Sequence, residues 1–551
     1  MTAGTAPKPG DVMVAMTPEE STAWIKAGCP DPVEWKASRG QVVELSVWKG
    51  TQKKPDGVKL DAELHVLIEQ TMAVAATHEK LYQKAGRLVC VESEDDGRVK
   101  LVAVSASRMR EMLSESSRWL KLDKKGTDYQ SVDPPEKLAE AMVARGSWDH
   151  IRPLRAVTAF PILSAKGSLC TKVGYVPDAK AYHAGKCPVE VPDSPTPEDA
   201  KDAINILFDI VCDFPFADEA HRSAWLAALL SPLSRFAHDG NIPLVVLQAN
   251  TRRAGKTKLV EIISQIVNGR APAVTTHTKN EEEERKRITS TLLGGPSIVL
   301  IDNVVSTFGG QNINALITSR EHGDRNLGKL EMLELENTAT WFVTGNNMLL
   351  APDVAQRSLH VRLQSDEEKP QKRSGFKYPD LIETVKERRA ELLGAALTIL
   401  KSYIAAGKPD MALPAWGSFE EWSRLVRGAI VWCGLPDPAL TREELEDECD
   451  AQMPLEHGLI EGWDELLILK GKSEGMTAKE VLDFLGGTND ACPTLRAALG
   501  EIAEHGKPLP NVNKLGARLR QLKNLNRGGK MLKDSGSDKL AKRWYIHHVQ
   551  P

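Results

Sequence analysis

The sequence lacks the cysteine pairs on which disulfide scaffolds and zinc fingers are built. Its 551 residues include eight scattered cysteines, with no CxxC pair and no histidine at metal-binding spacing from any of them. This pattern argues against both classes and favours a reduced cytosolic protein without structural zinc.

Long hydrophobic runs are missing as well. No stretch of eighteen apolar residues occurs, and residues 1–10 contain no apolar segment of the signal-peptide type. We therefore expect a soluble, cytoplasmic protein that is neither secreted nor inserted in a membrane.

An excess of positive charge is also absent. The formal net charge is −4, so the whole molecule is not a basic coat for nucleic acid, and any DNA contact must use local positive patches. A chain of this length predicts three or four domains, each with its own core. The N-terminal part shows no convincing pair of acids on a strand, as a primase requires, because Asp95 and Asp96 lie in a predicted hairpin turn.

What the chain does contain is a glycine loop between a strand and a helix. The apolar run 242–247 suits a strand buried on both faces, and residues 258–263 have a helical pattern. In such a loop the backbone N–H groups cradle phosphates, Lys256 bridges the β and γ phosphates of ATP, and Thr257 holds Mg²⁺. The predicted phosphate-binding residues are Asn250, Ala254, Gly255, Lys256, Thr257 and Lys258.

The loop departs from the motif G-x-x-x-x-G-K-[ST] at one position. Asn250 stands where the motif has its first glycine. Because Asn tolerates a positive φ better than most residues, we expect the loop to close around that position.

Two further strands are predicted to end beside this loop. One ends at Asp302 and the other is followed by Asn346 and Asn347. A carboxylate there holds Mg²⁺ through water, and an amide orients the attacking water and contacts the γ-phosphate. Arg357, farther along, is predicted to reach the nucleotide of a neighbouring subunit.

The residue that activates water is left open. Asp302 is followed by Asn303, which cannot accept a proton where AAA+ enzymes commonly carry a carboxylate. Glu283 or Glu284 is one candidate, and Asp302 alone is another. The charge run 281–287 equally suits a solvated helix face with acids near its N-terminus.

The order of these motifs resembles the superfamily 3 helicases, the ring-forming AAA+ branch of viruses, plasmids and phages, and more closely the helicase-like replication proteins of bacterial mobile elements. The resemblance covers most of the chain after about residue 60. The segments that carry it, besides the phosphate loop, are 283–288, 301–304, 324–328, 344–347 and 356–357, with 81–89 and 161–175 outside the core.

This resemblance implies a function and partners. It implies an ATP hydrolase acting as a DNA helicase, a hexameric ring of identical subunits, a bacterial host cytoplasm and a separate primase as partner. It also implies a hairpin between Asp302 and Asn346 that enters the ring's channel, where Arg325 and Lys329 grip one DNA strand. A salt bridge at a subunit interface is an equal alternative for Arg325.

The remaining regions are predicted from composition and pattern. Trp416, Trp422 and Trp432 recur at roughly helical intervals, and core packing is favoured over base stacking. The expected organisation is an α/β AAA+ P-loop core with an α/β N-terminal region and a C-terminal winged helix. The expected domains are an extension (1–60, partly disordered), an N-terminal α/β domain (61–190), a helical collar (191–240), the ATPase core (241–370), a helical lid (371–472) and the winged helix (473–551).

The last forty residues carry local positive charge. From Asn511 to Pro551 there are ten Lys or Arg residues against two Asp. The predicted DNA-contacting side chains on the helix of this segment are Lys514, Arg518, Arg520 and Lys523. A winged helix that binds protein, with incidental charge, is the alternative.

Three functions remain distinct at this point. The first is a DNA helicase or translocase driven by ATP and Mg²⁺. The second is an origin-binding ATPase switch that does not unwind processively. The third is a non-enzymatic scaffold in which Asn250 and Asn303 mark a dead site.

Overall fold

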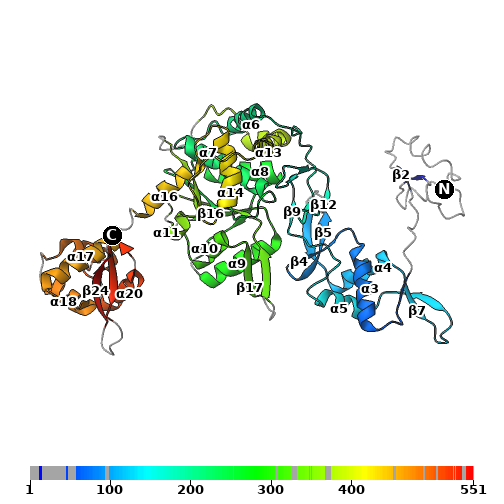
Figure 1. The fold of residues 1–551 in the computed structure, drawn as a ribbon, viewed down its shortest axis with the longest axis horizontal. Coiled ribbons are helices and arrows are strands. Elements are labelled where there is room, and N and C mark those ends of the chain that lie inside the picture. Colours follow the sequence, from blue (N-terminus) through cyan, green and yellow to red (C-terminus); the bar gives the residue numbers. More distant parts are fainter. Residues whose placement is uncertain are drawn as a thin grey trace. The chain divides into compact units, whose positions relative to one another are not determined.

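The computed structural model describes residues 12–14, 45–47, 57–93, 99–251, 253–278, 280–304, 308–325, 332–346, 348, 350–365, 374–450, 454–487, 491–503, 507–524, 526–527, 529–535 and 542–549. The chain divides into two compact units, Met1–Val157 and Thr158–Pro551, which Figure 1 colours from blue to cyan and from cyan to red. The sequence placed the end of the N-terminal domain later, near residue 190. Among the described helices, none combines the length and the apolar character needed to cross a membrane.

Within its described residues, the first unit contains two three-stranded sheets and three helices. A separate pair of strands precedes them, β1 (Val12–Val14) and β2 (Leu45–Val47), which are antiparallel. The strands and helices that follow are β3 (Val58–Lys59), α3 (Leu64–Ala76), β4 (Leu81–Lys84), β5 (Arg87–Ser93), β6 (Val99–Ala103), α4 (Ala106–Ser116), β7 (Trp119–Leu122), β8 (Tyr129–Val132), α5 (Glu136–Ala144) and β9 (Ala156–Thr158). Strands β4, β5 and β6 form an antiparallel meander, and β3, β7 and β8 form a second sheet. Trp119 and Trp148 are fully buried in the core of this unit, and their indole N–H groups donate to Leu113 O and Met142 O.

Two predictions for this unit are wrong. Residues 60–83 and 108–120 have helical patterns in the sequence, and each pattern predicts a helix over its whole range, but Leu81–Lys84 and Trp119–Leu122 are strands. Leu81 and Tyr82 pair with Cys90 and Val89 and are buried. Pairing and burial in the folded unit therefore override the local helical pattern. The predicted turn at 94–97 lies outside the described residues.

The second unit begins with short strands and two helices. These are β10 (Ile162–Leu163), β11 (Leu169–Cys170), β12 (Gly174–Val176), β13 (Ala181–His183), α6 (Pro197–Ile210) and α7 (Glu219–Ser234). Helix α6 starts as the sequence predicts: the Thr196 hydroxyl accepts from the Asp199 N–H, and the Asp199 carboxylate accepts from the Thr196 N–H. This reciprocal capping satisfies two otherwise free helix donors. Helix α7 is buried on nearly all sides, as expected for a helix in the interior of a large domain.

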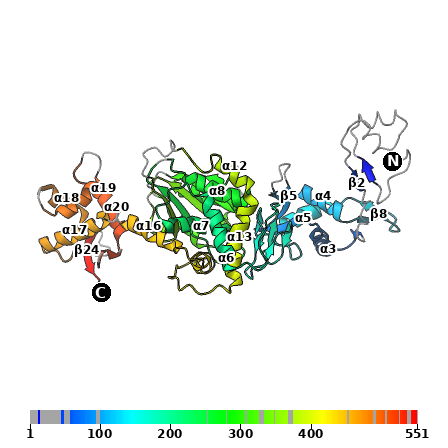
Figure 2. The same ribbon diagram turned by 90° about the horizontal axis from the view of Figure 1, so that it is seen from above.

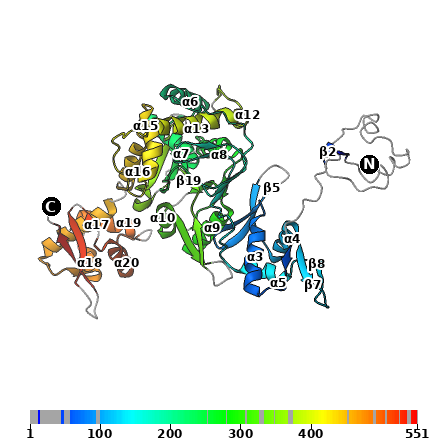
Figure 3. The same ribbon diagram turned by 45° about the vertical axis from the view of Figure 1, so that its right-hand side comes forward.

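A five-stranded parallel sheet forms the centre of this unit. Its strand order is β15-β16-β19-β14-β20, and every pair is parallel. The elements of this region are β14 (Leu244–Ala249), α8 (Lys256–Asn268), β15 (Ala273–Thr275), α9 (Glu281–Gly294), β16 (Ile298–Val304), α10 (Gln311–Thr318), β17 (Glu321–Arg325), β18 (Met332–Glu336), β19 (Thr340–Gly345), α11 (Pro352–Ala355) and β20 (Ser358–Leu363). Every residue of β14 and β19 is buried, because helices cover both faces of a parallel sheet. Helix α8 packs on the sheet and on α7, α12 and α13 (Figures 1 and 3).

Helices follow the last strand of the sheet. They are α12 (Leu381–Glu387), α13 (Arg389–Ala405), α14 (Glu420–Trp422), the π-helix η2 (Ser423–Arg427), α15 (Gly428–Trp432), the 3-10 helix η3 (Pro438–Leu440) and α16 (Thr441–Asp450). Helix α13 lies along α6 (Figure 2). Trp416 and Trp422 are buried with their rings edge to face, so both pack in the core and neither is a platform for a base.

The C-terminal region has its own core. It comprises α17 (Pro454–Lys470), β21 (Met476–Thr477), α18 (Ala478–Gly487), α19 (Pro493–Ile502), α20 (Val512–Leu522), β22 (Asn526–Arg527), β23 (Lys530–Asp534) and β24 (Arg543–His548). The strands form an antiparallel sheet in the order β21-β24-β23-β22. Its helices bury Trp463, Leu495 and Leu519 against Trp544 of the sheet. The buried set has the spacing of amphipathic helices on one face of an antiparallel sheet.

Candidate active site

The loop between β14 and α8 reverses through two left-handed residues. Arg253 has φ 63°, and Gly255, at the N-cap of α8, has φ 101°. A Cβ at Gly255 would stand 2.7 Å from the Phe214 ring, so glycine is required by both conformation and space. The reversal aims the free N–H groups at the start of α8 into the loop, where an anion is stabilised.

Asn250 acts through its side chain and not through a left-handed backbone conformation. Its φ is not positive, so the tolerance of Asn for that region is not used, and the left-handed residue of the loop before Gly255 is Arg253. The Asn250 side chain donates from Nδ2 to Ser365 O (2.9 Å) and accepts at Oδ1 from the Ser365 N–H (3.0 Å). This amide clamp ties the start of the loop to the chain just after β20, which a glycine has no side chain to do.

Lys256 lies between the loop and the neighbouring strand. Strand β19 lies between β14 and β16, so Asn346 at its end faces the loop from the adjacent strand. The Lys256 Nζ donates to Asn346 Oδ1 at 2.6 Å. Burial lowers the pKa of Lys256, and the nearby Asp302 opposes that shift. A buried cation with one neutral amide partner is poised to pair with phosphate oxygens.

Asp302 contacts two hydroxyl groups. Its Oδ1 accepts from Thr257 Oγ1 at 3.1 Å and from Thr344 Oγ1 at 2.6 Å. The same Thr344 oxygen accepts from the Asn303 N–H at 3.0 Å, where the strand bulges with Asn303 at φ 56°. The sequence assigned no role to Thr344, although its place two residues before Asn346 in a buried strand was the available signal.

These residues fit a magnesium ion. The Thr257 hydroxyl and the Asp302 carboxylate are adjacent hard oxygen donors, the kind that Mg²⁺ prefers beside phosphates. In the loop itself, the buried Thr251 Oγ1 has no hydrogen-bond partner within the described residues, as expected of a group placed for a phosphate oxygen.

The acids of α9 do not reach this cluster. Glu283 pairs with Arg287 at 3.0 Å, one turn along the same helix, and is half exposed. Glu284 points inward, where its carboxylate lies 3.0 Å from His277 Nδ1 and where burial raises its pKa while His277 lowers it. Within the described part of the chain, neither acid contacts Lys256 or Asp302.

Arg357 lies at the end of the parallel strands opposite to the loop, just before β20. Its carbonyl accepts from the N–H of Leu244, the first residue of β14, and its guanidinium donates to Asn314 Oδ1 at 3.0 Å. Since β14 then runs six residues to reach the loop, the two places are separated by roughly 20 Å. The structure therefore does not bring Arg357 to Lys256 of its own chain. Asn347, the other amide predicted here, lies outside the described residues.

A cavity of about 270 Å³ adjoins the phosphate loop. Segments 210–215 and 376–381 form its walls with the loop residues Arg253, Ala254, Gly255 and Lys258. Phe214 and Tyr378 supply aromatic surface, and Asp209 holds the Tyr378 hydroxyl and Arg388 behind the wall. Hydrogen bonds from Lys377, from Tyr378 and from Arg388, in that order of importance, lower the pKa of Asp209. A cavity with aromatic side chains in its wall, beside a phosphate site, suits the base of a nucleotide.

A hairpin stands where the resemblance implied one. Strands β17 and β18 pair from Glu321–Glu336 to Arg325–Met332. The hairpin is fixed to α9, because buried Asp324 near the end of β17 accepts from Arg285 (2.7 Å) and from Thr289. Arg325 ends β17, and Lys329 lies outside the described residues.

The basic side chains of α20 divide into two kinds. Arg518 pairs with Glu456 (3.1 Å) and Lys523 with Asp534 (2.7 Å). Lys514 and Arg520 are exposed and form no ion pair with other described residues. The free positive charge of this helix is therefore smaller than its composition indicates.

Comparison with known proteins is limited to solved structures. No family model matches the sequence, and no curated protein matches it. A structure titled as the apo C-terminal region of NrS-1 is 11% identical with a TM-score of 0.39, covering 86% of this chain and 98% of that one. The active helicase Cch of SCCmec type IV is 10% identical with a TM-score of 0.34, covering 84% of this chain and 91% of that one. The JCV helicase is 13% identical with a TM-score of 0.21, covering 46% and 73%. At such scores the assignment of function rests on the geometry of this chain.

Proposed function

We propose that this chain is an ATP-driven DNA helicase or translocase. The observation that carries the proposal is one cluster at the end of three parallel strands: Lys256 on Asn346, and Thr257 on Asp302, around a loop reversed at Gly255. Strand ends, a helix N-terminus and a buried lysine together make a triphosphate site.

Each side chain has a part in ATP hydrolysis. Lys256 neutralises charge on the β and γ phosphates, and Asn346 orients the attacking water by its amide. Thr257 and Asp302 would hold Mg²⁺, which would neutralise the charge that develops on the phosphate oxygens. The cavity between Phe214 and Tyr378 takes the base. Glu283 remains a predicted catalytic residue that contacts none of these groups.

Arg357 supports a shared site between subunits. Because it lies at the end of the strands opposite to the loop, it serves a nucleotide only on a neighbouring copy of the chain, where it stabilises transition-state charge. We infer a homo-oligomeric ring, with six subunits as the resemblance implies.

Mixed subunits test this arrangement. Arg357→Ala and Lys256→Ala chains, each inactive alone, should recover part of the ATPase activity when mixed, since some interfaces then pair an intact loop with an intact arginine. The Lys472→Ala chain, which alters an exposed residue outside the nucleotide site, mixed with Lys256→Ala is the control for simple dilution. Oligomers that form normally but recover no activity would overturn the shared site.

DNA contacts are proposed for two regions. We expect Arg325 and Lys329 of the segment that contains the β17–β18 hairpin to grip a single strand in the channel, and we expect α17–α20 with the β23–β24 hairpin to act as a winged helix on duplex or fork DNA. Replication of a phage, plasmid or other mobile element, with a separate primase, is the proposed setting.

An unwinding assay separates this function from its rival. The full chain with ATP and Mg²⁺ should separate a forked DNA duplex, and Lys256→Ala should not. DNA-stimulated ATPase with no strand separation would instead identify an origin-binding switch. Nucleotide binding without hydrolysis would identify a scaffold.

A further inference from the structure

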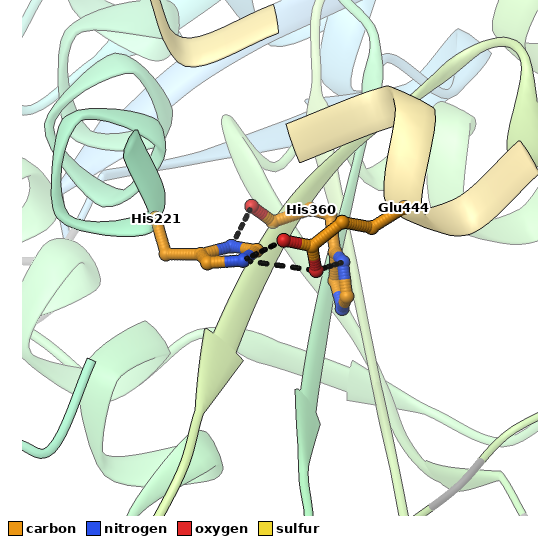
Figure 4. Close-up of side chains that lie close together, drawn as sticks. All are labelled: His221, His360 and Glu444. Atoms are coloured by element: carbon orange, nitrogen blue, oxygen red, sulfur yellow. Dashed lines mark hydrogen bonds and ion pairs between the residues drawn. The ribbon is translucent and has the colours of Figure 1, made fainter. Parts of the chain in front are cut away.

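Three side chains from distant parts of the second unit meet on the flank of the sheet. His221 lies on α7, His360 on β20 and Glu444 on α16, and Figure 4 shows them pointing toward one another. His221 Nε2 is 3.1 Å from Glu444 Oε2, and His360 Nδ1 is 3.9 Å from the same oxygen. One donor atom from each residue lies within 4.8 Å of the other two.

His360 is the unusual member of this cluster. Its side chain is fully buried, yet neither ring nitrogen has a hydrogen-bond partner within the described residues. A buried imidazole without partners is unfavourable, and native proteins rarely leave one unexplained. Burial, with His221 and Arg362 nearby, places the pKa of His360 well below its usual range, so the ring is neutral and offers a lone pair.

His221 is oriented by the backbone of β20. Its Nδ1 is 3.2 Å from His360 O and 3.2 Å from Arg362 N. If Nδ1 carries the proton, it donates to the His360 carbonyl and leaves the Nε2 lone pair facing Glu444, as in metal-bound histidines. If Nε2 carries it, the Arg362 N–H donates to Nδ1 and His221 donates to Glu444, which makes a hydrogen-bonded latch.

We propose that His221 Nε2, His360 Nδ1 and a Glu444 carboxylate oxygen bind one divalent transition metal ion, with zinc best suited to this donor set. Two imidazoles and one carboxylate are a known zinc set, and metal–donor bonds near 2.1 Å imply donor separations of about 3.4 Å in a tetrahedron. The two separations from Glu444 Oε2, 3.1 Å to His221 Nε2 and 3.9 Å to His360 Nδ1, bracket that value, and the two histidine donors lie within 4.8 Å of each other. Arg362 Nη1 lies 3.6 Å from Glu444 Oε2, so it competes for this carboxylate and releases it when metal binds.

The place of the site indicates a structural purpose. His360 pairs with Val246 in the middle of β14, away from the loop, so the ion takes no part in phosphate chemistry. It joins α7, the edge strand of the sheet and α16, the last helix before the C-terminal region. Metal binding there fastens α16 to β20 and so to the parallel sheet. The hydrogen bond from the His360 N–H to Thr441 Oγ1 (3.2 Å), at the start of α16, already joins these two elements.

Metal binding to the full chain tests the proposal. After treatment with a chelator, the protein should bind one equivalent of Co²⁺ per chain with the intense visible absorption of a low-symmetry, four-coordinate site, should exchange it for Zn²⁺, and should melt at a higher temperature when loaded. Loss of outer-shell partners alone costs metal sites about 10- to 100-fold in affinity. Glu444→Gln, which removes a direct ligand, should therefore lower affinity at least 10-fold.

Two variants make the result decisive. Glu443→Gln, an exposed acid one residue away on the same helix, is the matched control and should bind like the wild type. Glu444→Gln keeps a hydrogen-bond acceptor for His221, so it stays folded even if His360→Ala does not. The metal site would be ruled out by Co²⁺ binding that is equal in wild type and Glu444→Gln, or by a spectrum of hexahydrated metal only. His221 and Glu444 would then form only the hydrogen-bonded latch.

Discussion

The phosphate-loop end of the parallel sheet and the basic helix α20 both looked like functional sites in the sequence, but their charges are arranged differently. At the sheet, polar groups of two neighbouring strands and a helix contact one another: Lys256 on Asn346, and Asp302 between Thr257 and Thr344. On α20, acids of the same region already neutralise Arg518 and Lys523. A motif read with strand order therefore predicts a site better than a count of charges does, because counting ignores local pairing.

The largest effect is expected at Lys256. Lys256→Ala removes the buried cation that faces the phosphates, and ATPase activity should fall at least about 100-fold, the usual cost of removing one preorganised electrostatic group. Lys472→Ala is the matched control: this exposed side chain follows α17, takes no part in the nucleotide site and is 3.9 Å from Glu474, and its loss should leave most of the activity. Steady-state phosphate release measures both. Equal losses in the two variants would break the comparison.

Thr344 should matter more than a second threonine of the same strand. Thr344→Val removes the hydroxyl that donates to Asp302 and accepts from the Asn303 N–H, and an unsatisfied buried group costs about 1–3 kcal/mol. Thr340 is equally buried, but its hydroxyl has no partner within the described residues, so Thr340→Val should be neutral or stabilising. Urea unfolding and ATPase rates compare the pair. A more damaging Thr340→Val would contradict the assigned hydrogen bonds.

His238, a buried side chain between α7 and β14, predicts how the stability of the fold depends on pH. Burial, then the charges of Arg235, Arg320 and Lys408, lower the pKa of His238 to about 3. The Gly240 N–H donates to Nδ1, so the neutral ring carries its proton on Nε2 and faces Ser234 Oγ. The unfolded state binds a proton below about pH 6.5 while the folded state does not, so stability is present at neutral pH and is lost as pH falls from there toward 3, by up to about 1.4 kcal/mol per pH unit.

Two substitutions check the source of that slope. His238→Gln should flatten the dependence of the free energy of unfolding on pH between 6.5 and 4, and His547→Gln, an exposed control, should not. Urea unfolding at a series of pH values gives the slope. An unchanged slope in His238→Gln would show that other groups cause it.

The smallest effect is expected on α20, where it sharpens the comparison. Arg520→Ala removes a free exposed cation and should weaken DNA binding while reducing the slope of log affinity against log salt by about 1. Arg518→Ala removes a cation already paired with Glu456, so it should change DNA binding little and stability by no more than about 1 kcal/mol. If Arg518→Ala has the larger effect on DNA binding, pairing does not govern this surface.

Local patterns predicted the parts of the site that lie near one another in sequence. The strand, the reversed loop at Gly255 and the start of α8 follow from residues 242–263, and Asp302 and Asn346 follow from where buried strands end. The roles of the other residues depend on partners far along the chain. The side chain of Asn250 donates to Ser365, more than one hundred residues along the chain. The cavity wall is formed by segments near residues 213 and 378.

The spacing of cysteine and histidine residues in the sequence does not predict the histidine–glutamate cluster either. His221, His360 and Glu444 come from a helix, an edge strand and a second helix, and no spacing rule connects them. Likewise, Leu81–Lys84 has a helical pattern, and only its pairing with β5 makes it a strand. Long-range pairing, which a single sequence does not display, decided each of these cases.

The separation of Arg357 from the phosphate loop gives each chain two different faces. A contact that joins one chain's arginine to the next chain's loop is heterologous, so successive copies stack head to tail with a common direction. Such a contact has no twofold axis and leaves an unmatched face at each end unless rotation closes it. In the proposed ring, a copy that lacks Lys256 disables the interface at its own phosphate loop, whereas a copy that lacks Arg357 disables the interface at its neighbour's loop.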